Sequence, residues 1–169
     1  ALNARAIEEL CRLKGIDVRK KSLSMACHSL SQVSEYCKMN DRAFKFIKEH
    51  EVNYTFILPA SGALPRIFKH RREVGVRLAQ HPIGQLLSEH LGNPLITASL
   101  PIEDSDEPEY VTNPELIDER FGSFVSGVFD AGDIPLAPST VVDCTEEPFE
   151  ILRYGHGRLA DEEPLIKQE

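Results

Sequence analysis

The chain has 169 residues, the size of one domain that can bury a single sizeable core. Hydrophobic residues make up 41% of it and charged residues 27%, which excludes intrinsically disordered and fibrous proteins. The 27 acidic and 19 basic residues give a net charge of −8, which argues against a protein that simply coats nucleic acid but leaves room for a local basic patch. No apolar run approaches the roughly 20 residues that a membrane span needs.

Cysteine and histidine spacing predicts neither a disulfide framework nor a metal site. The sequence contains no C-x-x-C pair and no H-E-x-x-H motif. We therefore expect scattered, reduced, partly buried thiols, as in the cytoplasm, and no metal site built by this chain alone. The chain begins at Ala1 rather than Met, so we also expect that residues are missing before it. The cysteines are Cys11, Cys27, Cys37 and Cys144.

Helical and strand periodicities alternate along the first third of the chain. A helix is expected to end at Gly15. Ser31 is expected to cap a short helix through Cys37, and Asn40 or Asp41 a second helix that carries Phe44 and Ile47. Strands are predicted over 22–27 and 54–58, the second in the centre of a sheet.

The rest of the chain continues the alternation and then turns to strands alone. The predicted elements are, in order, a basic helix over 64–70, a strand over 74–78, a helix over 82–91, a strand over 95–99, an acidic loop over 101–113, a helix over 114–120, and strands over 124–129, 139–143 and 149–153. In the helix over 82–91 the expected buried stripe is Ile83, Leu86, Leu87 and Leu91. This order predicts a single-domain α/β fold, with a mixed sheet because the last strands lack intervening helices. We assign the domain to residues 1–158 and a C-terminal tail to 159–169.

The basic residues are segregated from the acidic ones. Acids crowd into 103–119 and 143–150, and the bases gather in two clusters. Such segregation indicates a cationic surface for an anion such as a nucleotide or an RNA phosphate, although solvated helix faces and loops would give the same pattern. The candidate RNA contacts are Arg66, Lys69, Arg71 and Arg72 of the second cluster. The clusters are Lys14, Arg19, Lys20 and Lys21, and then Arg66, Lys69, His70, Arg71, Arg72 and Arg77.

Three short segments carry side chains suited to an anionic ligand. Arg77 lies within the apolar run Val74–Leu78, where a guanidinium needs an anionic partner, a cleft or a route to solvent. Ser139 and Thr140 begin a strand, where hydroxyls and backbone N–H groups hold phosphate oxygens or simply make a turn. Arg153 ends a strand beside Gly155, where the backbone can approach a ligand closely or make a turn.

Five segments, taken in order, resemble the threonylcarbamoyl-AMP synthase superfamily (the YrdC-like proteins) and within it the YciO-like branch. The resemblance spans roughly residues 5–158. Its segments are Arg12-Leu13-Lys14-Gly15 with Ser22-Leu23-Ser24; Asn53–Pro59; Val74–Leu78 with His81-Pro82; Pro94–Leu100; and Pro138–Asp143 with Glu150–Gly155.

The resemblance implies a twisted α/β sheet with a cationic concave face, and a reaction. L-threonine, bicarbonate and ATP, the last with Mg²⁺, give threonylcarbamoyl-AMP and pyrophosphate, the first step of the t6A modification of tRNA. By similarity, the nucleotide is held by Lys14, Ser139, Thr140 and Arg153, and the threonine and carbamate end is lined by Thr55, Arg77 and Ser99, with Arg77 as the catalytic residue. We therefore predict that Arg77, Ser139 and Arg153 converge on one hollow shaped for a nucleoside triphosphate.

The sequence departs from the synthase pattern at three places. Ile16 stands where the synthases have the arginine of K-x-R, and Pro101 stands where they have the asparagine of S-x-N. The N-terminal P-T-[DE]-T-x-Y motif is absent from the sequence. These departures leave two functions open: a synthase, or a paralogue that binds nucleotide or double-stranded RNA with little or no catalysis. A third, weaker reading is a domain of a larger carbamoyl-transfer maturation factor.

Overall fold

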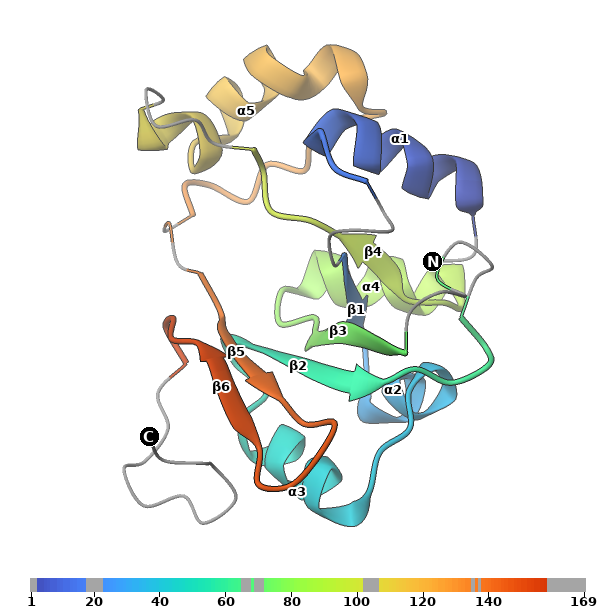
Figure 1. The fold of residues 1–169 in the computed structure, drawn as a ribbon. Helices are drawn as coiled ribbons and strands as arrows, with labels where there is room; N and C mark the ends of the chain where they lie inside the picture. Colours follow the sequence, from blue (N-terminus) through green and yellow to red (C-terminus); the bar gives the residue numbers. More distant parts are fainter. Residues whose placement is uncertain are drawn as a thin grey trace.

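A mixed six-stranded sheet forms the centre of the molecule (Figure 1). The computed structural model describes residues 3–17, 23–64, 68, 72–101, 107–134, 136 and 138–157. The strand order is β4-β1-β3-β2-β5-β6, with β1–β3 and β2–β5 parallel and the other neighbours antiparallel. The strands are β1 (Ser24–Cys27), β2 (Tyr54–Pro59), β3 (Glu73–Leu78), β4 (Leu95–Thr97), β5 (Thr140–Asp143) and β6 (Glu150–Arg153). The predicted single-domain α/β fold with a mixed sheet is confirmed, and the predicted central strand is β2.

Five α-helices flank the sheet in the described residues, and local signals set their ends. The helices are α1 (Ala4–Lys14), α2 (Leu30–Tyr36), α3 (Asp41–Glu49), α4 (Pro82–Leu91) and α5 (Pro114–Phe121). Asn3 begins α1 by accepting the Ala6 N–H, and Gly15 ends it with a φ of 65°, a conformation that glycine adopts without strain. Asn40 caps α3 as predicted, whereas α2 is capped by Ser29 rather than Ser31, two residues earlier than expected.

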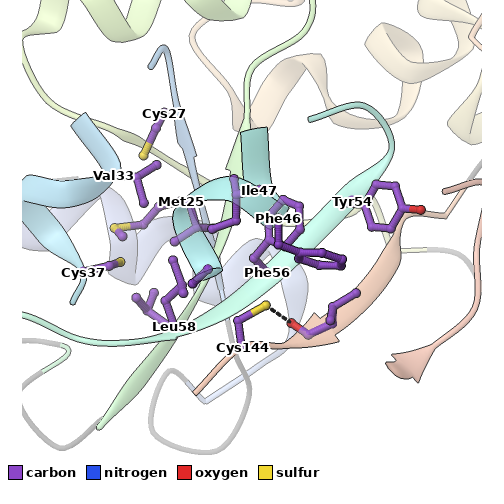
Figure 2. Packing of buried hydrophobic residues seen from close by; sticks show 14 of the residues in the cluster. Met25, Cys27, Val33, Cys37, Phe46, Ile47, Tyr54, Phe56, Leu58 and Cys144 are labelled. Atoms are coloured by element: carbon purple, nitrogen blue, oxygen red, sulfur yellow. Dashed lines mark hydrogen bonds between the residues drawn. The ribbon is translucent and has the colours of Figure 1, made fainter. Parts of the chain in front are cut away.

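The two faces of the sheet bury different kinds of side chain. Because successive residues of a strand point to opposite faces, Phe56 and Leu58 of β2 face one side and Thr55 and Ile57 the other. On the first side, Phe46 and Ile47 of α3 pack against β2 in the main hydrophobic core (Figure 2). On the other side lie α1 and a smaller cluster around Ile7 and Cys11. The second face is therefore only partly covered, and the pocket described below opens on it.

Helix α4 is less buried than its sequence pattern predicts. Leu86 and Leu91, expected in a buried stripe, are 53% and 55% exposed. The one fully buried residue of α4 is Ser88, whose hydroxyl donates to the side-chain oxygen of Gln32 of α2 at 2.8 Å. Phe44 of α3 is likewise 41% exposed. An apolar stripe marks one face of a helix but does not show how much of that face other elements cover.

The strand predicted over 124–129 is wrong. After a 3₁₀ turn, η3 (Gly122–Phe124), the described residues before β5 form no helix or strand, and Phe124 and Phe129 are 72% and 65% exposed. In the described sheet β5 pairs with β2 and β6, and no strand pairs with this segment. Gly127 also weakens strand formation there.

The predicted basic helix over 64–70 lies outside the described residues except for Leu64 and Phe68. The candidate RNA contacts Arg66, Lys69 and Arg71 also lie outside the described residues. So does the separate segment over 18–22, which holds three basic residues. Arg72 is described and is exposed just before β3. The tail over 159–169 also lies outside the described residues, and the cationic concave face stays a prediction.

Candidate functional site

A pocket of about 390 Å³ opens on the partly covered face of the sheet. It lies over the middle strands, several of whose residues have small or polar side chains here. The segments after α1, after β4 and before β5 form its walls. The lining residues are Lys14, Ile16, Ser24, Thr55, Ile57, Gly75, Arg77, Thr97, Ala98, Ser99, Pro138, Ser139, Val141 and Arg153. The predicted convergence of Arg77, Ser139 and Arg153 on one hollow is thus confirmed.

The floor of the pocket follows from strand alternation. Val74 and Val76 of β3 face the main core, so Gly75 and Arg77 face the pocket. A Cβ on Gly75 would lie 3.3 Å from the Ser24 hydroxyl oxygen. Because glycine has no Cβ, this space above the centre of the sheet stays open. Gly75 was not among the predicted lining residues, although its place two positions before Arg77 in one strand is a signal for it.

Ser139 connects two other polar residues of the pocket, Thr55 and Arg153. It is 5% exposed, and its hydroxyl oxygen lies 2.8 Å from that of Thr55, which is 6% exposed. Its carbonyl accepts hydrogen bonds from Arg153 Nε at 3.2 Å and Nη2 at 2.9 Å. Arg153 Nη2 also donates to the Ser139 hydroxyl oxygen at 3.3 Å. Backbone and side chain of one serine therefore hold the guanidinium in place.

A β-bulge aims Arg153 into the pocket. In the β5–β6 pair, Val142 lies opposite Ile151 but Val141 lies opposite Arg153, so Leu152 is the extra residue. With regular pairing, Leu152 would oppose Val141 on the pocket face and Arg153 would turn to the other face. The bulge instead leaves Leu152 55% exposed and places the guanidinium beside Ser139.

Arg77 differs from the other two cations that line the pocket, Lys14 and Arg153, because no described residue pairs with it. In the described part of the chain its guanidinium makes no hydrogen bond or ion pair. The side chain keeps contact with solvent, yet partial burial, and then the charge of Arg153, lower the pKa of Arg77 from its ordinary value. Two neighbouring guanidiniums with no acid in the described lining create a site that favours an anionic ligand.

Lys14 and Ser99 line the pocket at its α1 and β4 side. Lys14 Nζ donates to the carbonyl of Leu100 at 3.2 Å, which ties the end of α1 to the segment after β4. Ser99 is exposed and lies beyond β4, which ends at Thr97, two residues earlier than predicted. Ile16 also lines the pocket, so an apolar side chain occupies the position of the second basic residue of the K-x-R pattern.

Thr140, predicted together with Ser139 to hold a nucleotide, does not line the pocket. It is fully buried, because Ser139 and Thr140 are consecutive and must point to opposite faces. Its hydroxyl donates to the Gly157 carbonyl at 2.7 Å and accepts the Gly155 N–H at 2.9 Å. Thr140 thus anchors the loop after β6 rather than lining the pocket.

Among the described residues, no group of three His, Cys, Asp or Glu side chains could hold a metal ion. The four cysteines form no disulfide, and all four are buried rather than partly buried. Burial raises the pKa of Cys27, Cys37 and Cys144 to about 12. In the same described ranges, no helix combines the length and apolar character needed to cross a bilayer.

Comparison with known proteins gives relatives over nearly the whole chain. The Sua5/YciO/YrdC family model, described as "Telomere recombination", matches residues 1–155. YciO of Escherichia coli K12 is 32% identical over 155 residues, which cover 90% of this chain and 74% of that protein. A threonylcarbamoyl-AMP synthase of Hydrogenovibrio crunogenus is 30% identical over 111 residues, which cover 62% of this chain and 59% of that protein.

Solved structures agree with these matches. The crystal structure of E. coli YciO aligns with a TM-score of 0.79 at 31% identity, covering 92% of this chain and 75% of that one. The crystal structure of P. abyssi Sua5 complexed with L-threonine also aligns with a TM-score of 0.79, at 27% identity, and covers 92% of this chain and 46% of that one.

Proposed function

Because the chain belongs to the Sua5/YciO/YrdC family, we propose that its pocket is the active site of an L-threonylcarbamoyladenylate synthase that acts in tRNA t6A modification. The reaction converts L-threonine, bicarbonate and ATP to threonylcarbamoyl-AMP, pyrophosphate and water. The similarity to a threonylcarbamoyl-AMP synthase and to a Sua5 structure complexed with L-threonine supports this proposal. The observation that carries it is one pocket lined by Lys14, Arg77 and Arg153 with no acid in its described lining.

The reaction requires that the protein position its substrates and supply positive charge, and it needs no covalent intermediate with the protein. A carbamate oxygen on threonine attacks the α-phosphorus of ATP, an O–P bond forms, and the bond to pyrophosphate breaks. Arg153, Ser139 and Lys14 would hold the phosphates, and Thr55 and Ser99 would line the threonine end. Arg77 would stabilise the negative charge that develops between the two, because its guanidinium is free to turn toward an oxyanion.

Magnesium enters this proposal only with the nucleotide. The described lining of the pocket contains no carboxylate, so these residues do not fit a Mg²⁺ ion as direct ligands. Mg²⁺ would arrive bound to the phosphates of ATP, as part of the substrate.

The test is pyrophosphate release by purified protein given MgATP, L-threonine and bicarbonate. We expect release that depends on threonine, and Arg77→Ala should lower it at least tenfold, because a charge-assisted hydrogen bond of roughly 1.5–3 kcal/mol is lost. Arg5→Ala, on the exposed face of α1 and outside the pocket, is the matched control and should be unchanged. Threonine-independent release, or equal rates for Arg77→Ala and wild type, would contradict the proposal.

Two observations favour a second function, nucleotide or double-stranded RNA binding with little catalysis. Ile16 lines the pocket in place of a basic residue, so it offers no charge to the phosphates. Lys14 already uses one of its three N–H donors on the Leu100 carbonyl beside Pro101. If this function holds, RNA retention should fall steeply with salt, and replacing Arg71 and Arg72 together with alanine should flatten that slope. An unaltered slope would reject this patch as the RNA contact.

A further inference from the structure

The outer face of α3 carries two lysines and an exposed aromatic ring in one stripe. The positions are i, i+3, i+4 and i+7, and all four side chains are exposed. In the described part of the chain, neither lysine of the stripe makes a hydrogen bond or an ion pair. Beside the stripe, Arg42 is already paired with Glu147, and Glu49 is a single exposed acid. The stripe consists of Asp41, Phe44, Lys45 and Lys48.

The described part of the chain ends at Gly157, close to the C-terminal end of α3. The Gly157 carbonyl accepts from the Thr140 hydroxyl at 2.7 Å, and a Cβ on Gly157 would lie 2.5 Å from the ring of Tyr54. The ring of Tyr54 in turn meets that of His50, the residue that ends α3, with 5.3 Å between centroids. Tyr54 belongs to the main core, so the chain reaches Gly157 on the α3 side of the sheet.

The sequence after Gly157 carries side chains in an order that complements the stripe. Read from the C-terminal end of α3, the stripe presents cations, then the Phe44 ring, then an acid. Residues 161–163 are acidic, 165 and 166 are leucine and isoleucine, and Lys167 is basic. The stripe covers about 10 Å of helix axis, and residues 161–167 reach up to about 20 Å when extended, so the segment is long enough to run along it.

We propose that residues 161–167 dock on the stripe, antiparallel to α3. The acids over 161–163 pair with Lys45 and Lys48, the two apolar residues cover Phe44, and Lys167 meets Asp41. Exposed ion pairs are individually weak, but the short tether from Gly157 gives the segment a high effective concentration at α3. Because α3 and the pocket lie on opposite faces of the sheet, this docking does not depend on the proposed function.

A fluorescent reporter in the segment tests the docking in the full chain. The protein contains no tryptophan, so Leu165→Trp adds a single indole. Acrylamide is a neutral quencher, and its access to the indole is insensitive to charge changes elsewhere. A segment docked more than half of the time should give a quenching constant about twofold or more below that of a peptide of residues 158–169 with the same substitution. Lys45→Glu combined with Lys48→Glu should raise the constant to the peptide value, and high salt should raise it as well.

Arg5→Glu combined with Arg12→Glu is the matched control. It makes the same change of charge at exposed residues of α1, on the other side of the sheet, and should leave the quenching constant unchanged. Reversing the charge of the segment with Asp161→Lys and Glu163→Lys should restore protection in the variant that lacks both lysines of the stripe. A failure of this reversal to restore protection would overturn the pairing.

The apolar contact has its own pair of variants. Phe44→Ala should raise the quenching constant, whereas Phe124→Ala, which removes another exposed ring, should not. Equal constants in the protein and in the peptide would overturn the docking. Protection that increases with protein concentration would place the segment on a second copy of the chain, and would overturn the intramolecular contact.

Discussion

The buried hydroxyl of Thr140 provides a sharp test of how the loop after β6 is held. It makes two hydrogen bonds, to the Gly157 carbonyl at 2.7 Å and from the Gly155 N–H at 2.9 Å. Thr140→Val keeps the shape of the side chain and removes both bonds. Each buried group left without a partner costs about 1–3 kcal/mol, and the half-buried Gly155 N–H regains some of this from water. We therefore expect the free energy of unfolding to fall by about 2–4 kcal/mol.

Thr140→Ser is the matched control for this change. It keeps the hydroxyl and removes one buried methyl group, which costs about 1 kcal/mol. Urea unfolding followed by far-UV circular dichroism would give the free energies of both variants, provided that the slope with denaturant is unchanged. A valine variant within about 0.5 kcal/mol of the serine variant would refute the role assigned to the hydroxyl.

The same change should reach the pocket. The loop that Thr140 anchors returns to the pocket wall, where the His156 N–H donates to the Pro138 carbonyl at 2.9 Å. Loosening the loop therefore frees the segment that contains Ser139, the residue that holds Arg153. We expect Thr140→Val to weaken ligand binding under conditions in which it is still folded, although Thr140 does not line the pocket.

Two further predictions concern close packing and buried thiols. A Cβ on Gly155 would overlap the Pro138 carbonyl and lie 2.5 Å from the Ser139 carbonyl carbon, so Gly155→Ala should lower the unfolding free energy by about 2 kcal/mol or more. Gly75→Ala, whose Cβ meets nothing closer than 3.3 Å, should unfold near the wild-type midpoint but bind ligand less well; equal midpoints for the two variants would contradict this packing. Because burial raises the pKa of three thiols from 9.0 to about 12, the unfolded chain ionises first, and stability should fall as pH rises above about 9, by roughly 1 kcal/mol per thiol at pH 10. Cys144→Ala should show a smaller drop between pH 8 and pH 10 in urea unfolding, and an equal drop would argue against the raised pKa.

Sequence periodicity predicted most elements because each carries its own local signal. Gly15 and Asn40 mark helix ends through backbone conformation and capping, which depend on a few neighbouring residues. The predicted strand over 124–129 failed because a strand also needs a partner strand, which a local pattern does not reveal, and the described sheet pairs no strand with this segment. The prediction that Leu86 and Leu91 are buried failed for a similar reason, since their exposure depends on which distant elements pack against α4.

The candidate site was predictable as a set of residue types but not as a surface. Arg77 lies within an apolar strand, and burying an unpaired guanidinium costs free energy. The sequence therefore indicated that this side chain meets a ligand or solvent. The assignment of both Ser139 and Thr140 to the nucleotide ignored strand alternation, which permits only one of them to reach the pocket. The same alternation in β3 puts Gly75 on the face of Arg77, so the pattern of the strand alone is enough to add this glycine to the site.

Arg153 shows most clearly why the sequence alone does not specify the site. Its place on the pocket face depends on one extra residue, Leu152, in the pairing of β6 with β5, and bulges leave no reliable mark in a single sequence. The cost of the bulge is an exposed leucine and an interrupted ladder of hydrogen bonds. The bulge also places the Arg153 guanidinium so that its Nε and Nη2 donate to the Ser139 carbonyl and its positive charge acts on that of Arg77. An interrupted strand pair that brings two like charges together would be disfavoured in a purely structural role, so the arrangement is best explained by an anionic ligand that neutralises both.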